Sequence, residues 1–204
     1  MTFDLTPEQK TLVATAKNAA SLPKKAADAV LVIEERATAD PAEAARFGFE
    51  GVGGRSSTTA AMLPGLEGSE AALASVPESN RILAKLIAAA VALGVGRAAI
   101  AHAVTSLKKR DIKPGPDTTV PHWALADGAT EVEAARMLTY AAAQIFDLGQ
   151  RADDLVTRAL DYASNAAQQA VDAAIRVEGA TGYTKGSLLE RLTRDARTLQ
   201  VILR

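Results

Sequence analysis

The sequence contains no cysteine, few aromatic residues and almost no net charge. Its 204 residues include two His and 4% aromatics, and the formal net charge is −1 at pH 7. Without cysteine the chain has no disulfide framework, thiolate nucleophile or zinc–thiolate site. A nearly neutral chain has no global basic field that would attract nucleic acid or anionic lipid. We therefore expect neither nucleic acid nor a membrane as a partner.

The sequence also lacks the marks of a targeting or membrane segment. Met1 leads directly into Thr2-Phe-Asp-Leu5, without the basic and apolar stretches of a secretion signal. The most apolar run, residues 86–104, is rich in Ala and interrupted by Arg97. A membrane span needs about 20 strongly apolar residues, so this run is typical of a buried core helix. These features predict a cytoplasmic protein.

The pattern of apolar residues and helix breakers predicts an all-α protein. Ala is a strong helix former, and no segment alternates apolar and polar residues for long enough to form a strand. Shorter helices are expected at residues 7–20, 24–38 and from 41, then a glycine-rich loop at 48–57 and a short helix near Ser69. Long helices are expected at 79–110, 122–148, 151–178 and 188–203, with a connection at 111–121. Four long helices with short connections form a bundle.

These boundaries imply two domains, a short N-terminal helical subdomain over 1–75 and a C-terminal four-helix bundle over 79–204. Thr6, Pro7 and Gln9 form a helix-start signal, and Ser187 with Glu190 forms a capping box for the last helix.

The first long helix has an unusual composition. Residues 86–101 are apolar nearly all round, which places this helix at the centre of a bundle or at an oligomer interface. Gly94 and Gly96 inside it each cost about 1 kcal/mol relative to Ala. Close approach of a neighbouring helix would explain both glycines. We expect a homodimer or larger assembly, or an obligate hetero-oligomer.

The most specific motif lies near the end of the sequence. Residues 179–185, Gly-Ala-Thr-Gly-Tyr-Thr-Lys, precede residues 190–197, Glu-Arg-Leu-Thr-Arg-Asp-Ala-Arg. Together they resemble the C-terminal signature of acyl-CoA dehydrogenases. Segments 92–99 and 125–138 are similar to earlier helices of the same family, in the same order and spacing. The resemblance implies an acyl-CoA dehydrogenase-type C-terminal bundle in a family of FAD-dependent oxidoreductases.

The chain departs from the family pattern in two ways. The family carries a β-domain between its N-terminal helices and its C-terminal bundle, but only residues 55–78 fill that place here, too few for a domain. In many members a Glu in the final motif is the base that removes the substrate α-proton. Leu203 stands at that position, and Asn80 stands at the alternative position used by other members. Neither side chain can act as a general base, so we predict no catalytic residue.

The family's cofactor contacts are only partly retained. Arg110 matches an Arg that reaches a cofactor pyrophosphate across a dimer interface. Arg176 replaces the Gln of a Gln-x-x-Gly-Gly motif, and Glu178 adds an anion nearby. The resemblance predicts no FAD or weakly bound FAD, with residual contacts from Arg110, Arg176, Gly179, Gly182 and Tyr183.

The remaining candidate side chains are expected to have ordinary structural roles. His102 and His122 have no second ligand at metal-binding spacing, so no metal is predicted. Trp123 is expected to anchor a helix start. Arg191 and Asp195 are expected to form a surface pair four residues apart on a helix.

Three functions remain open. The first is a non-dehydrogenating partner or scaffold subunit, a pseudoenzyme in a homo-oligomer or in a hetero-oligomer with a full-length acyl-CoA dehydrogenase. The second is an enzyme with altered chemistry that binds flavin or an acyl thioester, from acyl-CoA or an acyl carrier. The third is a helical binding module unrelated to CoA. The missing base and β-domain favour the first.

Overall fold

The computed structural model describes residues 5–52, 75–110 and 119–201, and every regular element in these ranges is a helix, which confirms the predicted all-α fold. The α-helices are α1 (Pro7–Thr15), α2 (Ala26–Ala37), α3 (Pro41–Gly51), α5 (Arg81–Lys109), α6 (Thr119–Asp147), α7 (Asp153–Glu178) and α8 (Leu188–Val201). Short 3-10 turns, η1 (Ala16–Asn18), η4 (Glu78–Asn80) and η5 (Gly179–Tyr183), adjoin α1, α5 and α7.

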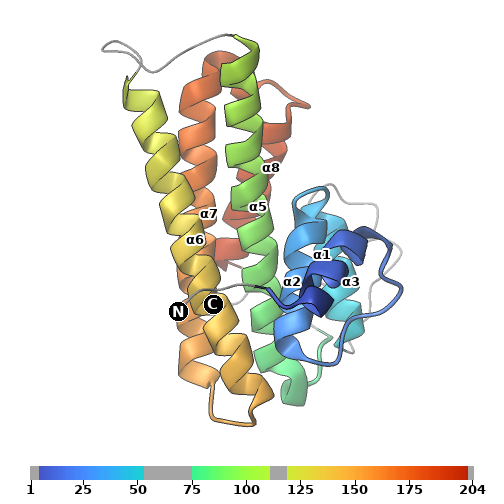
Figure 1. Ribbon diagram of the computed structural model, residues 1–204. Helices are drawn as coiled ribbons and strands as arrows, with labels where there is room; N and C mark the ends of the chain where they lie inside the picture. The colour runs from blue at the N-terminus through green and yellow to red at the C-terminus, as the bar shows by residue number, and fades with distance from the viewer. Residues whose placement is uncertain (1–4, 53–74, 111–118, 202–204) are drawn as a thin grey trace.

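The long helices α5, α6, α7 and α8 form a bundle, and α1–α3 pack beside the lower half of α5 (Figure 1). α5 is the central element, since it contacts α2, α3, α6, α7 and α8. Buried side chains of α2, α3 and the bundle belong to one continuous hydrophobic core. The division into two domains at residues 75–79 therefore stays a prediction.

The two halves of α5 differ in burial. Ala84 and the unbroken run Leu86–Gly96 are buried, whereas beyond Gly96 only Ala99, Ala103 and Leu107 are buried. The spacing of four residues leaves one buried stripe in the upper half. Up to Gly96 the helix lies at the centre of the bundle, as expected, whereas beyond Gly96 only one stripe is buried within this chain. The chain's own α2 and α3 cover the lower half, so its apolar character does not itself require a second subunit.

Two glycines allow neighbouring helices to approach α5 closely, as predicted. A Cβ added at Gly94 would lie 2.4 Å from the Ala37 Cβ on α2. At Gly96 it would lie 2.8 Å from Val132 Cγ2 on α6. Both distances are shorter than van der Waals contact, so a larger residue at either position would force a helix outward.

Helix caps are partly local and partly tertiary. Thr6 and Gln9 form the predicted capping box at the start of α1. At α8 the box is half made, because Ser187 Oγ accepts from the Glu190 amide at 3.1 Å while the Ser187 amide donates to the Thr184 carbonyl at 3.0 Å. α2 has no side-chain cap from its own N-cap residue. Its first amides are bound by Asp147, at the end of α6.

Several predicted boundaries need correction. Residues 48–51 continue α3 instead of forming a loop, because Gly48 packs closely against Ile87 of α5. The first helix ends at Thr15, earlier than predicted, and α6 already begins at Thr119, so the connection is shorter than predicted. The helix predicted near Ser69 lies outside the described residues.

One helical stretch, Glu78–Lys109, is long and apolar enough to cross a membrane by length and composition, but 72% of its most apolar window is buried inside the protein. This is the burial of a core helix.

Candidate functional site

The position where some acyl-CoA dehydrogenases carry an alternative base is occupied by an amide with a structural role. Asn80 ends η4, directly before α5. Its side-chain amide donates a hydrogen bond of 2.9 Å to the Val52 carbonyl, just after α3. Asn80 therefore ties α3 to the start of α5. The other family position, Leu203, lies outside the described residues.

Glu78 is the nearest carboxylate in sequence to this position. Its side chain is 89% exposed and lies 3.3 Å from Arg81 Nε. A carboxylate in contact with bulk water and an arginine is poorly suited to abstract a carbon-bound proton, because such a base works best in a water-excluded site with a raised pKa.

Arg110 makes a bond within the chain. Its Nη2 donates to the carbonyl of Val177 at 2.9 Å, in the last turn of α7. A cation at a helix C-terminus satisfies an orphan carbonyl and offsets the negative end of the helix dipole. Arg110 thus joins the upper ends of α5 and α7, where the sequence predicts a phosphate contact.

The other predicted cofactor residues lie around the turn after α7. Gly179 has φ +70°, a conformation that favours glycine, Gly182 is buried, and Tyr183 is 66% exposed. Arg176, Gly179 and Tyr183 line an open cleft of about 480 Å³, together with Asp172, Ile175 and Ala180. Arg110 does not belong to its lining. Three of the five predicted cofactor residues therefore share one cleft, and Arg110 is bonded to the carbonyl of Val177, two residues before Gly179. Their role in holding a cofactor stays a prediction.

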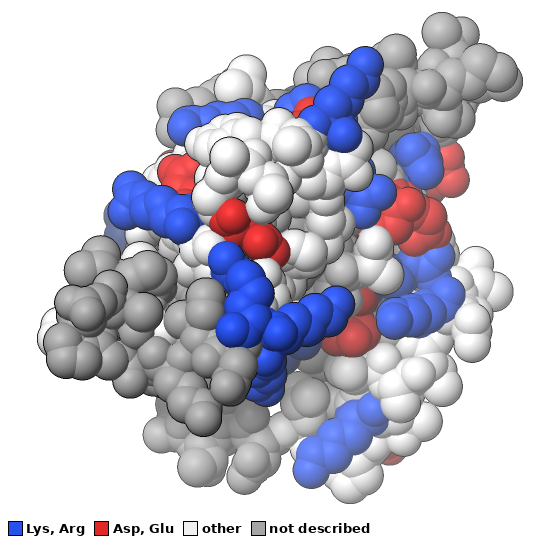
Figure 2. Space-filling view, turned by 90° about the horizontal axis from the view of Figure 1, so that it is seen from above, with Lys and Arg blue, Asp and Glu red and all other residues white. Residues whose placement is uncertain are grey.

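The anion predicted near this turn has a partner on another helix. Glu178 Oε1 lies 3.1 Å from His102 Nε2 on α5. Within the described residues, no group of three or more potential metal ligands is present. Seen from above in Figure 2, basic and acidic side chains are interspersed over this end of the bundle.

Two further predictions about single side chains are wrong. Asp195 is buried, at 1% exposure, so it does not lie on the surface of α8 as predicted. The ion pair four residues apart on α8 joins Arg194 Nε and Glu190 Oε1 instead, at 2.9 Å. Trp123 does not anchor α6 to the core, because its side chain is 69% exposed.

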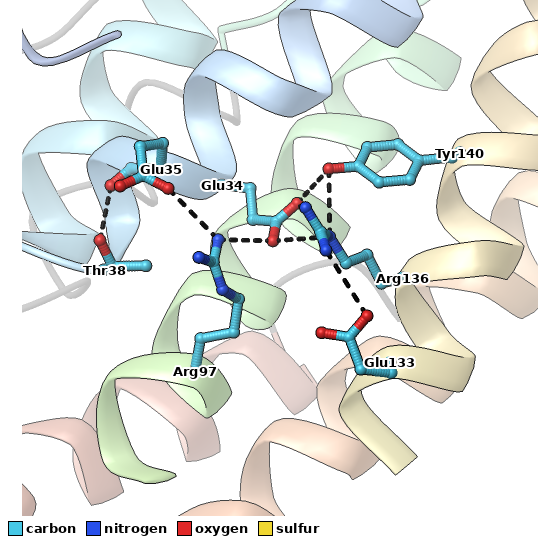
Figure 3. Close-up of polar contacts among 7 residues, drawn as sticks. All are labelled: Glu34, Glu35, Thr38, Arg97, Glu133, Arg136 and Tyr140. Atoms are coloured by element: carbon cyan, nitrogen blue, oxygen red, sulfur yellow. Dashed lines mark hydrogen bonds and ion pairs between the residues drawn. The ribbon is translucent and has the colours of Figure 1, made fainter. Parts of the chain in front are cut away.

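Sequence reasoning missed the most elaborate polar cluster in the described structure, which surrounds Glu34 (Figure 3). Glu34 projects from α2 and is 1% exposed. Its carboxylate lies 2.7 Å from Arg97 Nη1 on α5 and 3.0 Å from Arg136 Nε on α6. The Tyr140 hydroxyl, also on α6, donates a further hydrogen bond to it.

Outer carboxylates extend this cluster toward solvent. Glu35 lies 3.4 Å from Arg97, and Glu133 lies 3.5 Å from Arg136. The Arg136 guanidinium also lies over the Tyr140 ring, 5.3 Å from its centre. Each buried charge thus has an opposite charge within contact, as burial of charge requires.

The cluster changes the ionisation of its members. Burial, reinforced by the Glu34 carboxylate, raises the pKa of Tyr140 well above its usual value. Burial disfavours the charge of Arg136, but Glu34, Tyr140 and Glu133 together outweigh burial and raise the pKa of the guanidinium. Tyr140 is therefore held neutral and Arg136 charged, so the cluster is a fixed junction between α2, α5 and α6.

Comparison with known proteins matches the bundle to one family. The family model for the acyl-CoA dehydrogenase C-terminal domain matches residues 83–202. An acyl-CoA dehydrogenase of Bacillus subtilis is 37% identical over 125 residues, which cover 60% of this chain and 33% of the relative. A 3-(aryl)acrylate reductase of Clostridium sporogenes is 36% identical over 115 residues, covering 55% and 30%. The chain thus spans about a third of the length of these relatives.

The fold agrees with this match. Butyryl-CoA dehydrogenase of Megasphaera elsdenii aligns with a TM-score of 0.74 and 16% identity, covering 100% of this chain and 96% of that one. At this identity the alignment supports the fold alone. The family model covers more than half of the chain, and the helical bundle and the motif around Gly179–Tyr183 agree with it. The chain therefore belongs to the acyl-CoA dehydrogenase family.

Proposed function

We propose that this chain is a non-dehydrogenating member of the family that acts by binding, as a partner or scaffold subunit. The observation that carries the proposal is the amide of Asn80, which occupies the alternative base position and is bonded to the Val52 carbonyl. Leu203 at the usual base position and the short segment in place of the β-domain support the same conclusion. The partner is a second copy or a full-length acyl-CoA dehydrogenase.

Flavin binding is expected to be absent or weak in this role. Arg110 is engaged by the end of α7, and Glu178 lies beside the turn that would face cofactor phosphates. A nearby anion opposes phosphate binding. The visible absorption spectrum of the purified chain mixed with FAD and then desalted measures this directly.

The test of the proposed function is an activity assay. The purified chain is mixed with a range of acyl-CoA thioesters, FAD and an artificial electron acceptor, with a full-length acyl-CoA dehydrogenase as the positive control. We expect no turnover from the chain alone. Appreciable turnover would overturn the proposal, and its survival in Glu78→Gln would also exclude Glu78 as the base.

A second candidate function is supported by a cleft on the exposed half of α5. This cleft, of about 480 Å³, has two titratable groups, Arg97 and His102, among apolar and hydroxyl side chains. The remaining lining residues are Thr38, Ala98, Ala101, Thr105 and Leu188. A mainly apolar cleft with a few polar groups is typical of small-molecule sites. An enzyme of altered chemistry would bind its acyl thioester here.

Calorimetric titration with acyl-CoA thioesters tests this alternative. Ala101→Trp, which fills the cleft, should abolish binding, whereas Ala134→Trp on α6 should leave it unchanged. Heat of binding lost only in Ala101→Trp would favour the second function over the first.

A further inference from the structure

A groove of about 370 Å³ runs between the upper half of α5 and the first half of α6. Its lining is mainly apolar, with one Lys and one His at the end near the start of α6: Ile100, Val104, Leu107, Lys108, His122, Leu125, Ala126 and Ala129. It shares no lining residue with the cleft that contains His102, which lies on another side of α5. A mainly apolar recess with a few polar groups is typical of small-molecule sites.

The groove exists because branched side chains of α5 face small side chains of α6. Ile100 and Val104 of α5 are only half-buried. On the α6 side of the groove Ala126 is exposed and Ala129 is half-buried. Alanine side chains are too short to cover the two branched side chains, so apolar surface stays accessible between the helices. Burial of this surface by an apolar ligand is favourable.

The lower end of the groove meets the Glu34 cluster. At 3.6 residues per turn, Arg97 lies about one turn below Ile100 on α5, and Glu133 lies about one turn below Ala129 on α6. Arg97 is already paired with the buried Glu34 carboxylate at 2.7 Å. Glu133 is 53% exposed, and its charge disfavours a second anion nearby. This end therefore does not favour the anionic group of a ligand.

The upper end of the groove is basic. Lys108 lies in the last turn of α5, and His122 lines the same end from α6. A lysine can place its alkyl stem along an apolar surface and keep its ammonium group in water. Lys108 is exposed, and in the described part of the structure it forms no ion pair. The charge along the groove thus favours an anion at Lys108 and an apolar group below it.

The length of the groove limits the size of the ligand. From Ile100 to Lys108 it extends about 12 Å at 1.5 Å per residue, the length of an extended chain of about nine carbons. The basic group lies at one end of this distance, and the side chains along the rest of it are apolar. A ligand that fits has one anionic head and one unbranched apolar tail.

We propose that this groove binds a medium-chain alkyl carboxylate, with the carboxylate at Lys108 and the tail between α5 and α6 toward Ala129. The site uses neither the cofactor turn after α7 nor the cleft with His102. The inference therefore goes beyond the proposed partner role and does not depend on it.

Calorimetric titration with decanoate tests the ligand class. Octanoate, which is two methylene groups shorter, should bind up to about tenfold more weakly, because each buried methylene contributes to affinity. Decanol has the same tail without the charge, and it should bind about fivefold more weakly than decanoate. Trp123, the only tryptophan, directly follows His122, so its emission provides a second readout of binding in the unmodified chain.

Paired variants test the location of the site. Ala126→Trp fills the groove from an exposed position and should abolish decanoate binding, whereas Ala134→Trp, exposed on the same helix but outside the lining, should not. Lys108→Ala should weaken decanoate about fivefold and leave decanol unchanged. Lys109→Ala, at the next exposed position and outside the lining, should change neither. Circular dichroism shows that each variant is folded.

The proposal has clear points of failure. It is overturned if decanoate does not bind at millimolar concentration, or if Ala126→Trp binds it as well as the unmodified chain does. Equal weakening by Lys108→Ala and Lys109→Ala would also overturn it, because it would show general attraction to a basic helix end. A chain that binds decanoate in the groove and also dehydrogenates acyl-CoA would refute the proposed function and leave this site standing.

Discussion

The lower and upper halves of α5 belong to one continuous helix but have different surroundings. Residues Leu86–Gly96 are buried on all sides, because α2 and α3 add a second layer opposite α6 and α7. From Arg97 onward one stripe faces the bundle, and the opposite side lines the cleft with His102. Apolar residues of α5 thus belong to the core in the lower half, whereas in the upper half some of them form an accessible surface.

The boundary between the halves is where the Glu34 cluster lies. Arg97 is the first residue after the buried run, and it binds the Glu34 carboxylate of α2 at 2.7 Å. Arg136 and Tyr140 fix the same carboxylate to α6. The N-terminal helices are therefore attached to the bundle by both close packing and buried charge. The buried charges lie near Arg97, where α2 and α3 cease to cover α5.

The largest expected effect comes from removing the shared carboxylate. Glu34→Ala removes the buried counter-ion of Arg97 and Arg136 and leaves them only the outer carboxylates of Glu35 and Glu133. Loss of one partner of a buried ion pair costs about 3–5 kcal/mol. Chemical denaturation should show this loss in the free energy of unfolding. Glu35→Ala is the control, since its 3.4 Å contact is partly exposed and should contribute less than about 1 kcal/mol. Equal losses in both variants would contradict the central role of Glu34.

A packing substitution tests the difference between the halves of α5 directly. Gly94→Ala places a Cβ 2.8 Å from the Glu34 carbonyl oxygen and closer still to Ala37, so α2 must move. Overpacking of this kind costs about 1–3 kcal/mol. Ala101→Leu in the exposed half should change stability by less than about 0.5 kcal/mol. Thermal unfolding of the two variants measures the contrast, and similar shifts would show that the halves do not differ.

The cap that α6 supplies to α2 should have a smaller effect. Asp147 accepts from the amides of Ala26 and Ala27 at 2.7 and 2.9 Å. Loss of a helix N-cap costs about 1 kcal/mol, so Asp147→Ala should lower the free energy of unfolding by that amount. Asp127→Ala, near the other end of the same helix, is the control and should be nearly neutral. Hydrogen exchange of the α2 amides shows whether the loss is local.

The smallest effect is a pH dependence of the cluster. The folded-state pKa of Tyr140 is raised above its unfolded value of about 10, so its contribution to stability is complete below pH 10. Above pH 10 the unfolded chain loses the proton first, and stability falls as pH rises. Tyr140→Phe should flatten this alkaline slope, whereas Tyr183→Phe, at an exposed position, should not. An unchanged slope in Tyr140→Phe would assign it to another group.

Local sequence signals predicted much of the helical framework. Three signals depend only on neighbours within a few residues and can therefore be recognised in the sequence. They are the Thr6–Gln9 box, the apolar periodicity of the long helices and the motif after Gly179. Gly94 and Gly96 also predicted close helix approach correctly, because a glycine inside an apolar helix leaves space for a neighbouring helix at the cost of helix propensity. The family resemblance followed from the same local motifs.

The tertiary structure alone decided which residues meet across the chain. Glu34 reads as an ordinary helix residue, and its contacts with Arg97 and Arg136 join positions 63 and 102 residues apart. The sequence does not show that the Arg110 guanidinium binds the Val177 carbonyl of α7, or that the Asn80 amide binds the Val52 carbonyl just after α3. The continuation of α3 through Gly48 likewise depends on Ile87. Sequence patterns fix helices because helical hydrogen bonds are local, whereas buried charges and helix ends find their partners only when the helices pack.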